Sequence, residues 1–553
     1  MGAAGLVPDS VEGPAVSRLR ALRGVPRWTP APDYSITQDA LFAHDPSAVA
    51  LLTAGPHAPN EITFGEVQRA ALRIAGVLQA RGVDPGDRVA MYLEPSPTAA
   101  QTVFGVLAAG AVLVPVPRLM AGASVAHRLG DSGAKVLVTD GPGLDRLRST
   151  GCAIEDRMVL RVDGVDGQCV AGQSVEPHRE APHPGGPTQP ALLMYTSGTS
   201  GPPKGIVHGH QVLLGHAGVD CAFEFFEPGD VYYGTADWGW IGGLMLGLLV
   251  PWSFGVPVVA QRQPRFDPDA ALDLFARCGV STAFLPPSVL RLFQANGRAP
   301  ERRLRAVVTG GEQAGRSEMA WARLHLAQAV NKAYGQTEAN ALIGDAAVLG
   351  SVDDDTMGTA YPGHRIALLG EDGEEVGRGE VGEIALGLPD PVALLGVWDA
   401  ESARAVPPEG TWHRTGDLAR RAHTRRFEYL GRVDDVIKSR GYRIGPAEIE
   451  DALVKHPRVL EAAAVGIPDD KIGQHIKVFL RLSEREGEGE GEGAGQGDGE
   501  SGGLDDPLRA QLGELVATSV GPHARPRQFE VVAALPRNET GKLLRRRLTS
   551  HSH

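Results

Sequence analysis

Hydrophobic and polar positions follow two different periods along most of the chain, which predicts helices and strands in alternation. Residues 64–80 repeat apolar side chains at helical spacing, and a continuous apolar run at 89–93 follows after a glycine-containing turn. The same alternation recurs, with helices expected at 99–109, 124–132 and 267–277 and strands at 112–116, 135–139, 283–285 and 306–308. Apolar strands that alternate with helices are typical of helix-covered parallel sheets, so we expect an α/β fold.

The length of the chain and a change of pattern near residue 430 predict two domains. Single cores stop growing at roughly 250–300 residues, whereas this chain has 553. After residue 430 a charged turn, a short strand and a helix from Pro446 follow in quick succession. We expect a large N-terminal domain of helix-covered, mostly parallel sheets over 1–433 and a small mobile α+β domain over 434–553. Residues 484–503, rich in glycine and glutamate, predict a disordered acidic insert.

Composition and charge narrow the possible functions. The net charge of -13 argues against a general nucleic-acid binder, which would be basic. Four scattered cysteines without a C-x-x-C pair predict a reduced, cytoplasmic protein. Residues 241–260 carry no charge, but Pro251 and Pro257 interrupt them. We interpret this run as a buried helix, a turn and a buried strand, and expect no membrane span.

The strongest chemical signal is the run YTSGTSGPPKG at 195–205, which follows the apolar residues 191–194. Its glycines let backbone N–H groups approach an anion, its hydroxyls donate hydrogen bonds, and Lys204 supplies positive charge. The spacing differs from that of a Walker P-loop. We interpret the run as a phosphate-binding loop at the end of a strand; the alternative is a flexible surface turn.

This run resembles the phosphate loop of the adenylate-forming superfamily, which includes acyl-CoA synthetases, luciferases and peptide-synthetase adenylation domains. Further motifs follow in the order of that family over nearly the whole chain. The resemblance implies a ligase that activates a small carboxylic acid with ATP and Mg²⁺ and then transfers the acyl group to coenzyme A. The sequence is most similar to bacterial short- and medium-chain acyl-CoA synthetases.

Several motifs together would form the nucleotide site. In AYGQTE at 333–338, the ring of Tyr334 would pack on adenine, Thr337 would bond the α-phosphate and Glu338 would hold Mg²⁺. The resemblance implies nucleotide contacts from Thr196, Ser197, Gly198, Thr199, Ser200, Gly201, Lys204, Gly311, Glu312, Gln313, Tyr334, Gln336, Asp417 and Arg432. By themselves these motifs are also compatible with a helix cap, strand-end turns and a surface ion pair.

The C-terminal motifs imply a domain that changes position between two half-reactions. Asp434 in GRVDD would be the hinge, and Lys542 in PRNETGK would stabilise charge between the acid and the α-phosphate. The loop SRGYRIG would meet coenzyme A through Arg440, Gly441 and Arg443. The basic stretch 543–548 (LLRRRL) predicts a solvated helix face.

The acyl pocket is expected around TADWGWI at 235–241. Trp238, Trp240 and Ile241 would face an uncharged acyl tail, with His208 and Gly335 beside them; core packing is the alternative for Trp240. Acetate-restricted relatives carry Trp where this chain has Gly335, which implies a deeper pocket and a preference for propionate, butyrate or longer acids. Gly335→Trp should then shorten the preferred acid, provided that the backbone does not require glycine.

Two other functions remain open from the sequence. An amino-acid or aryl-acid adenylating enzyme that loads a carrier protein is one, since Asp237 could pair with a substrate amine. A degenerate nucleotide-binding regulator is the other, although the intact Thr196, Glu338, Asp417 and Lys542 argue against it. The sequence does not set the exact acid or the oligomeric state.

Overall fold

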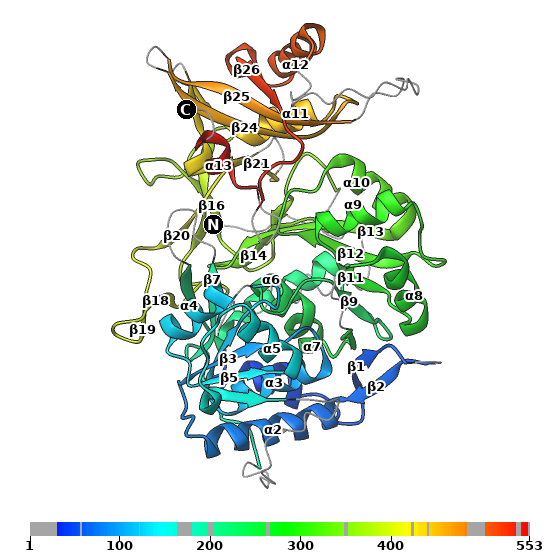
Figure 1. The fold of residues 1–553 in the computed structure, drawn as a ribbon, viewed down its shortest axis with the longest axis vertical. Helices are drawn as coiled ribbons and strands as arrows, with labels where there is room; N and C mark the ends of the chain where they lie inside the picture. Colours follow the sequence, from blue (N-terminus) through cyan, green and yellow to red (C-terminus); the bar gives the residue numbers. More distant parts are fainter. Residues whose placement is uncertain are drawn as a thin grey trace, which may run out of the picture. The chain divides into compact units, whose positions relative to one another are not determined.

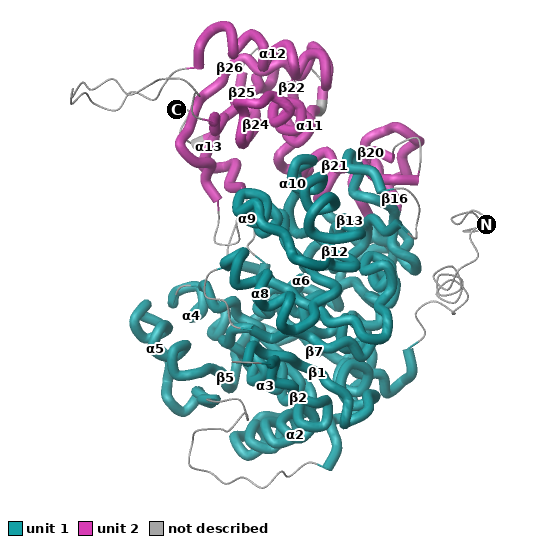
Figure 2. The backbone as a smooth tube through the Cα atoms, turned by 90° about the vertical axis from the view of Figure 1, so that its right-hand side faces the viewer, with its two compact units in different colours: residues 1–366, 386–415 teal, residues 367–385, 416–553 magenta. Residues whose placement is uncertain are grey.

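A computed structural model shows how these predicted elements fold. It describes residues 30–55, 58–120, 122–162, 180–196, 203–261, 266–347, 352–421, 425–439, 442–469, 472–483, 504–537 and 543–550. The chain divides into two compact units, residues 1–366 with 386–415 and residues 367–385 with 416–553 (Figure 2). The chain passes from the first unit into the second for the last time between Thr415 and Gly416. The hinge expected at Asp434 stays a prediction.

The first unit contains two large sheets that are parallel through most of their strands (Figure 1). One has the order β15 (Thr359–Ala360), β14 (Asn340–Gly344), β13 (Ala327–Gln336), β12 (Leu304–Gly310), β11 (Thr282–Phe284), β9 (Tyr232–Gly234), β10 (Val258–Val259), β1 (Val49–Thr53), β2 (Asn60–Thr63). The other has the order β19 (Arg404–Val406), β18 (Gly396–Asp399), β8 (Lys204–Gly209), β7 (Pro190–Thr196), β4 (Val112–Pro115), β3 (Arg88–Tyr92), β5 (Val136–Thr139), β6 (Val159–Arg161). The predicted α/β class with mostly parallel sheets is confirmed.

The predicted helices form within a few residues of their expected bounds. They are α2 (Phe64–Ala80), α3 (Pro97–Ala108), α4 (Gly122–Ser132) and α8 (Pro268–Cys278), with α5 (Gly141–Ser149), α9 (Pro287–Asn296) and α10 (Arg316–Trp321) in addition. The start of α2 is fixed by a capping box, in which the Thr63 hydroxyl accepts from the Glu66 N–H and the Glu66 carboxylate accepts from the Thr63 N–H.

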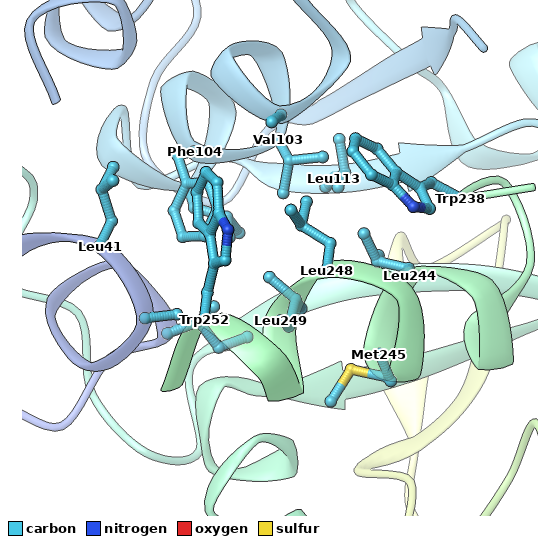
Figure 3. Packing of buried hydrophobic residues seen from close by; sticks show 14 of the residues in the cluster. Leu41, Val103, Phe104, Leu113, Trp238, Leu244, Met245, Leu248, Leu249 and Trp252 are labelled. Carbon is cyan, nitrogen blue, oxygen red and sulfur yellow. The ribbon is translucent and has the colours of Figure 1, made fainter. Parts of the chain in front are cut away.

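The uncharged run 241–260 folds as a buried helix, a turn and a buried strand, as predicted. It comprises α6 (Ile241–Leu244), a π-helical turn (Met245–Leu249), α7 (Val250–Ser253) and β10. Figure 3 shows this segment packed on α3, where Trp252 stacks on Phe104 with ring centroids 5.1 Å apart. Among the described residues, no helix is both long enough and apolar enough to cross a membrane.

The second unit holds most of a four-stranded sheet and a complete five-stranded sheet. The four-stranded sheet has the order β16 (Ile366–Leu369), β17 (Val381–Gly387), β20 (Trp412–Arg421), β21 (Phe427–Arg432). The five-stranded sheet has the order β23 (Tyr442–Ile444), β22 (Ile437–Ser439), β25 (Gly473–Leu482), β24 (Val459–Asp469), and β26 (Gln528–Val531) also pairs with β25. Helices α11 (Pro446–Leu453) and α12 (Asp506–Ser519) bury Ile449, Leu453 and Leu512 in its core. The acidic insert expected at 484–503 lies outside the described residues.

The basic stretch near the C-terminus is only partly a solvated face. It begins helix α13 (Arg545–Ser550), and Arg546 and Arg547 are exposed as predicted. The prediction is wrong for Arg545, whose guanidinium lies 2.6 Å from both carboxylate oxygens of Glu450 on α11. A carboxylate buried between packed elements requires a partner, and charge counting along the sequence could not identify it.

Candidate active site

The phosphate-binding run begins at the end of a buried hairpin. Strands β7 and β8 are antiparallel, and Thr196 lies opposite Lys204 at the end where the run connects them. The interior of both strands is buried, whereas Thr196 is half-buried and Lys204 is exposed. Residues 197–202 lie outside the described residues, among them the predicted contacts Ser197, Gly198, Thr199, Ser200 and Gly201. The strand predicted before the run is confirmed, and the run connects the two strands.

A side chain that the sequence did not mark anchors this hairpin beside the phosphate-binding run. Asp131 on α4 accepts a 2.6 Å hydrogen bond from the Tyr195 hydroxyl, directly before Thr196. The backbone carbonyl of Asp131 also accepts from the indole N–H of Trp398 at 2.9 Å. No sequence signal marks Asp131, because its partners are distant in the chain.

The turn at 310–313 begins where β12 ends beside its parallel neighbour β13. Gly310 at the end of β12 pairs with Ala333 on β13, and a Cβ at Gly310 would lie 2.3 Å from the Ala333 carbonyl oxygen. Gly311 has φ +90°, a conformation that favours glycine. Ligands of α/β sheets bind outside the carboxyl ends of such strands. The predicted adenine-binding turn therefore has the backbone geometry of a ligand-binding edge.

Glu312 has a structural contact at this turn. One of its carboxylate oxygens accepts a 2.8 Å hydrogen bond from the Ser288 N–H in the first turn of α9, and it also bonds Arg291 at 3.2 Å. A carboxylate at a helix N-terminus satisfies free N–H groups and favours the helix dipole. The nucleotide contact expected of Glu312 stays a prediction, as does that of Gln313.

Gly335 lies in a β-bulge that leaves no room for a side chain. The pairing between β13 and β14 shifts register between Tyr334 and Gly335. A Cβ at Gly335 would lie 1.7 Å from the backbone oxygen of Asn340 and 2.9 Å from the Cα atom of Ala341. The backbone therefore does require glycine, so the condition on which Gly335→Trp depended is not met. A deeper acyl pocket cannot be tested by that substitution.

The residues after Gly335 are held by the backbone of neighbouring segments. The Gln336 side-chain amide donates to the Thr415 carbonyl at 3.2 Å. The Glu338 carbonyl accepts from the Leu394 N–H at 2.8 Å. Thr337 and Glu338 are half-buried. These contacts fix the turn that carries the Thr337 hydroxyl and the Glu338 carboxylate.

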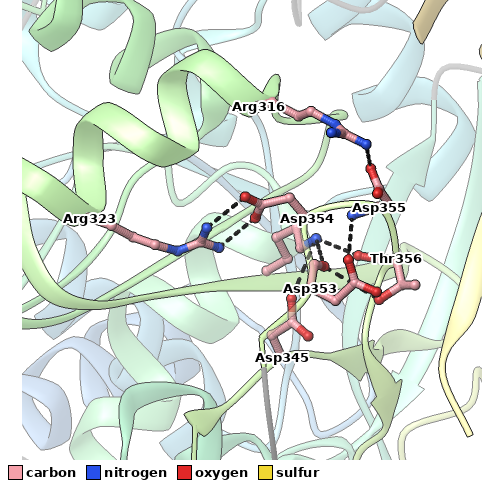
Figure 4. A network of polar contacts seen from close by, with 8 residues as sticks. Arg316, Arg323, Asp345, Asp353, Asp354, Asp355 and Thr356 are labelled. Atoms are coloured by element: carbon pink, nitrogen blue, oxygen red, sulfur yellow. Dashed lines mark hydrogen bonds and ion pairs between the residues drawn. The ribbon is translucent and has the colours of Figure 1, made fainter. Parts of the chain in front are cut away.

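Upstream of this turn, Lys332 on β13 secures the loop 352–356, whose Asp353, Asp354, Asp355 and Thr356 are drawn in Figure 4. Its ammonium donates to the carbonyl of Asp353 at 2.7 Å and to that of Thr356, and lies 3.5 Å from buried Asp345. The same loop is held from the other side by Arg323, which forms a bidentate pair with Asp354 at 2.7 and 2.6 Å. The strand that carries Tyr334 is therefore rigidly supported.

His208 is fully buried on β8, where it pairs with Leu192 of β7. Its Nε2 lies 2.7 Å from the Thr337 carbonyl oxygen. Burial lowers the pKa of His208 to about 4, although the nearby backbone of Thr337 and Ala393 opposes that shift. The structure thus places His208 against the backbone of the Gln336–Glu338 turn. Its predicted contact with the acyl group stays a prediction.

The expected acyl-pocket residues differ in their burial. Trp238 is 2% exposed and packs in the main core near Leu244 (Figure 3). Trp240 and Ile241 are half-buried, and Trp240 packs against a second core cluster. Trp238 is therefore a core residue in this structure, and the core-packing alternative for Trp240 keeps its support.

Asp237 ties its loop to another segment. Its carboxylate accepts from the Arg118 N–H at 3.0 Å and from the Gly239 N–H at 2.7 Å. Burial raises the pKa of Asp237 to about 6, against the opposing effect of these two hydrogen bonds. Both oxygens already have backbone donors, so this arrangement gives little support to pairing with a substrate amine.

In the second unit, Asp417 and Arg432 lie opposite each other on β20 and β21. The Arg432 guanidinium is 3.4 Å from an oxygen of nearly buried Asp417, and the Tyr429 hydroxyl donates to the same oxygen at 3.3 Å. Gly416 has φ +72°, and its N–H donates to Glu383 at 2.7 Å. Tyr429 and Glu383 were not predicted; cross-strand pairing brings them to this group.

The remaining C-terminal predictions are mostly beyond the described residues. Asp434 is exposed in a short 3₁₀ helix at Val433–Asp435. Arg440, Gly441 and Lys542 lie outside the described residues, as does the side chain of Arg443. The stretch that contains Lys542 is flanked by a bridge between Arg537 and Leu543 and by the Leu544 N–H, which donates to the Pro536 carbonyl at 2.8 Å.

Comparison with known proteins establishes the class. The model of the AMP-binding enzyme family matches residues 39–392, and that of the AMP-binding enzyme C-terminal domain matches residues 448–542. The acetyl-coenzyme A synthetase of Bacillus subtilis is 28% identical over 516 residues, which are 90% of this chain and 86% of that protein. The mitochondrial acyl-coenzyme A synthetase ACSM5 of Mus musculus is 27% identical over 511 residues, covering 88% and 83%. The crystal structure of a Brucella canis acyl-CoA synthetase matches with TM-score 0.66 and 28% identity, covering 97% of each chain.

The fold, the motifs in their order and these relatives together define an AMP-forming acid–CoA ligase. The chain belongs to the AMP-binding enzyme family, as its phosphate-binding run and the AYGQTE motif predicted. ATP, coenzyme A and a carboxylic acid are accordingly its substrates.

Proposed function

We propose that this ligase activates a short- or medium-chain carboxylic acid with an uncharged acyl tail. One observation carries the catalytic part of the proposal. His208 links the β7–β8 hairpin, which holds the phosphate-binding run, to the Thr337–Glu338 turn. Half-buried Trp240 and Ile241 support an uncharged acyl group, because an apolar wall would penalise an unpaired charge.

The reaction would proceed in two steps. An oxygen of the acid attacks the α-phosphorus of ATP, and the bond to the bridging oxygen breaks to release pyrophosphate. The thiol of coenzyme A then attacks the acyl carbon, loses its proton, and AMP departs. Thr196, Lys204 and Thr337 would hold phosphate oxygens, Asp417 would bind the ribose hydroxyls, and Lys542 would stabilise charge in the first step.

Magnesium fits the residue types at this turn. The Glu338 carboxylate and the Thr337 hydroxyl are hard oxygen donors, and Mg²⁺ is commonly held by one or two carboxylates together with substrate phosphates. Bound there, the ion would neutralise phosphate charge and orient the nucleotide. The protein's own part is to keep the Glu338 backbone fixed, which the Leu394 N–H does at 2.8 Å.

Carrier-protein loading stays the second candidate, with less support because both oxygens of Asp237 bond backbone N–H groups. We also infer a cytoplasmic location. Within the described part of the chain, Cys152, Cys221 and Cys278 are buried free thiols, which suits a reducing compartment.

The test is ATP–pyrophosphate exchange over a panel of aliphatic acids from acetate to octanoate together with amino acids and aryl acids, with coenzyme A and a carrier protein compared as acceptors. Lys542→Ala should abolish exchange while sparing thioester formation from supplied acyl-AMP. Asp434→Pro should do the converse, because proline fixes φ at the expected hinge. Exchange limited to amino or aryl acids, or acyl transfer to a carrier protein alone, would contradict the proposal. Normal exchange by Lys542→Ala would remove only the role given to that lysine.

A further inference from the structure

We propose that His208 is a positioning residue for adenylation, which fixes the Thr337–Glu338 turn against strand β8 instead of contacting the acid. This inference rests on the proposed function, because it assigns the role of Thr337 and Glu338 to ATP and its metal ion.

Three hydrogen bonds connect the turn to the strand. His208 Nε2 reaches the Thr337 carbonyl oxygen at 2.7 Å. The next carbonyl, that of Glu338, accepts from the Leu394 N–H at 2.8 Å, and the adjacent Leu395 N–H donates to the Val207 carbonyl at 2.7 Å. Two consecutive carbonyls of the turn are therefore held to β8, one directly and one through residues 394–395. Of these three hydrogen bonds, the one from His208 uses a side chain, and the other two join backbone groups.

The chemistry of the imidazole suits this position. A carbonyl oxygen can only accept, so Nε2 must carry the hydrogen, which fixes the tautomer. The imidazole thus supplies a directional hydrogen bond in a buried place.

The position of His208 also favours a positioning role over direct contact with the acid. His208 is 0% exposed, and its ring faces a backbone oxygen of the turn. Strand β8 follows the phosphate-binding run directly, so the imidazole joins the two elements expected to bind the α-phosphate. A shift of about 1 Å in a positioned group can cost roughly 100-fold in rate.

His216 provides a matched control within the same unit. It is 2% exposed, and burial likewise lowers its pKa to about 4. Its Nδ1, however, bonds the Val212 carbonyl four residues earlier at 2.8 Å, which is a local contact. Substituting His216 thus removes a buried imidazole of similar environment without releasing the turn.

The experiment compares His208→Gln, His208→Asn and His216→Asn in pyrophosphate exchange. A glutamine amide nitrogen reaches the place of Nε2, whereas an asparagine amide is one methylene shorter and cannot donate to Thr337. We expect His208→Asn to lower kcat about 10- to 100-fold and to raise the Mg²⁺ concentration needed for half-maximal rate. His208→Gln should recover most of the rate, and His216→Asn should keep kcat. The KM for the acid and the ranking of acids by chain length should not change in any variant.

The opposite pattern would overturn the proposal. Altered acid ranking with kcat retained in His208→Asn would make His208 an acyl-pocket residue. Equal loss in His208→Gln and His208→Asn, or equal loss in His216→Asn, would show a role in stability alone; thermal denaturation of each variant is measured alongside. Failure of the proposed function appears separately, as absence of exchange by the unmodified enzyme with every acid.

Discussion

At the scale of single residues, the structure gives a different reason for glycine at position 335 in the AYGQTE motif. The resemblance to acetate-restricted relatives, which carry Trp at this position, predicted that Gly335 leaves space in the acyl pocket. The structure shows a bulge in which the backbone of Asn340 occupies the place of a Cβ. Gly335 is therefore required by the close approach of two strands, and it sets the path of the chain into Thr337 and Glu338.

Gly335→Ala should accordingly damage both stability and catalysis. A Cβ 1.7 Å from the Asn340 oxygen forces the bulge to move, and overpacking of this kind costs typically about 1–3 kcal/mol. We expect the free energy of unfolding, measured in urea, to fall by that amount and exchange activity to fall at least tenfold. The control is Gly130→Ala on α4, where a Cβ would meet nothing within 4 Å. Unchanged stability in Gly335→Ala would contradict the bulge geometry.

At the scale of elements, a half-buried ion pair joins helix α13 to helix α11. Arg545 and Glu450 have side chains only 21% and 16% exposed, and the Ala464 N–H also donates to Glu450 at 2.8 Å. Asp435 lies 3.9 Å from the same guanidinium. The helix after the Lys542 stretch is therefore attached through charge and not through an apolar face alone.

Removing one partner of this pair should destabilise the second unit. Arg545→Met leaves the Glu450 carboxylate buried without its cation, and such losses cost about 3–5 kcal/mol. We expect that decrease in urea unfolding, with most of it recovered in the double variant Glu450→Leu/Arg545→Met. Arg546→Met, at an exposed position of the same helix, should stay within about 0.5 kcal/mol of the unmodified protein. A harmless Arg545→Met would mean that the pair is solvated.

At the scale of the whole molecule, three buried histidines make stability depend on pH. Burial lowers the pKa of His208, His210 and His216 to about 4. All three belong to the first unit, and each bonds a backbone group; His210 Nδ1 accepts from the Ile36 N–H at 3.2 Å. In the unfolded chain the same side chains titrate near the usual value of about 6.5.

Stability should therefore fall as pH drops from about 6.5 toward 4. In that window the unfolded state binds protons that the folded state does not, so the free energy of unfolding decreases with decreasing pH. Urea unfolding at pH 7.5, 6 and 5 measures the slope. His210→Asn keeps an acceptor for the Ile36 N–H but does not titrate, and it should show a smaller slope than the unmodified protein. Identical slopes would contradict a depressed pKa for His210.

The sequence by itself determined the class of fold and the family. Helical and strand periods depend on neighbours in the chain, so helices such as α2 and α8 were predicted nearly to their ends. The phosphate-binding run and AYGQTE are contiguous motifs, and their residue types report their chemistry directly. The uncharged run 241–260 was likewise read correctly, because two prolines interrupt it.

Tertiary structure decided how those motifs are held. Asp131 beneath Tyr195, Tyr429 beside Asp417 and Glu450 against Arg545 are pairs whose members are separated in sequence, so no local pattern marks them. The same is true of His208, whose identity suggested a pocket residue but whose contact is a carbonyl brought in by another sheet. Packing and backbone hydrogen bonds are set by which strands become neighbours, and that physical relation appears only when the chain is folded.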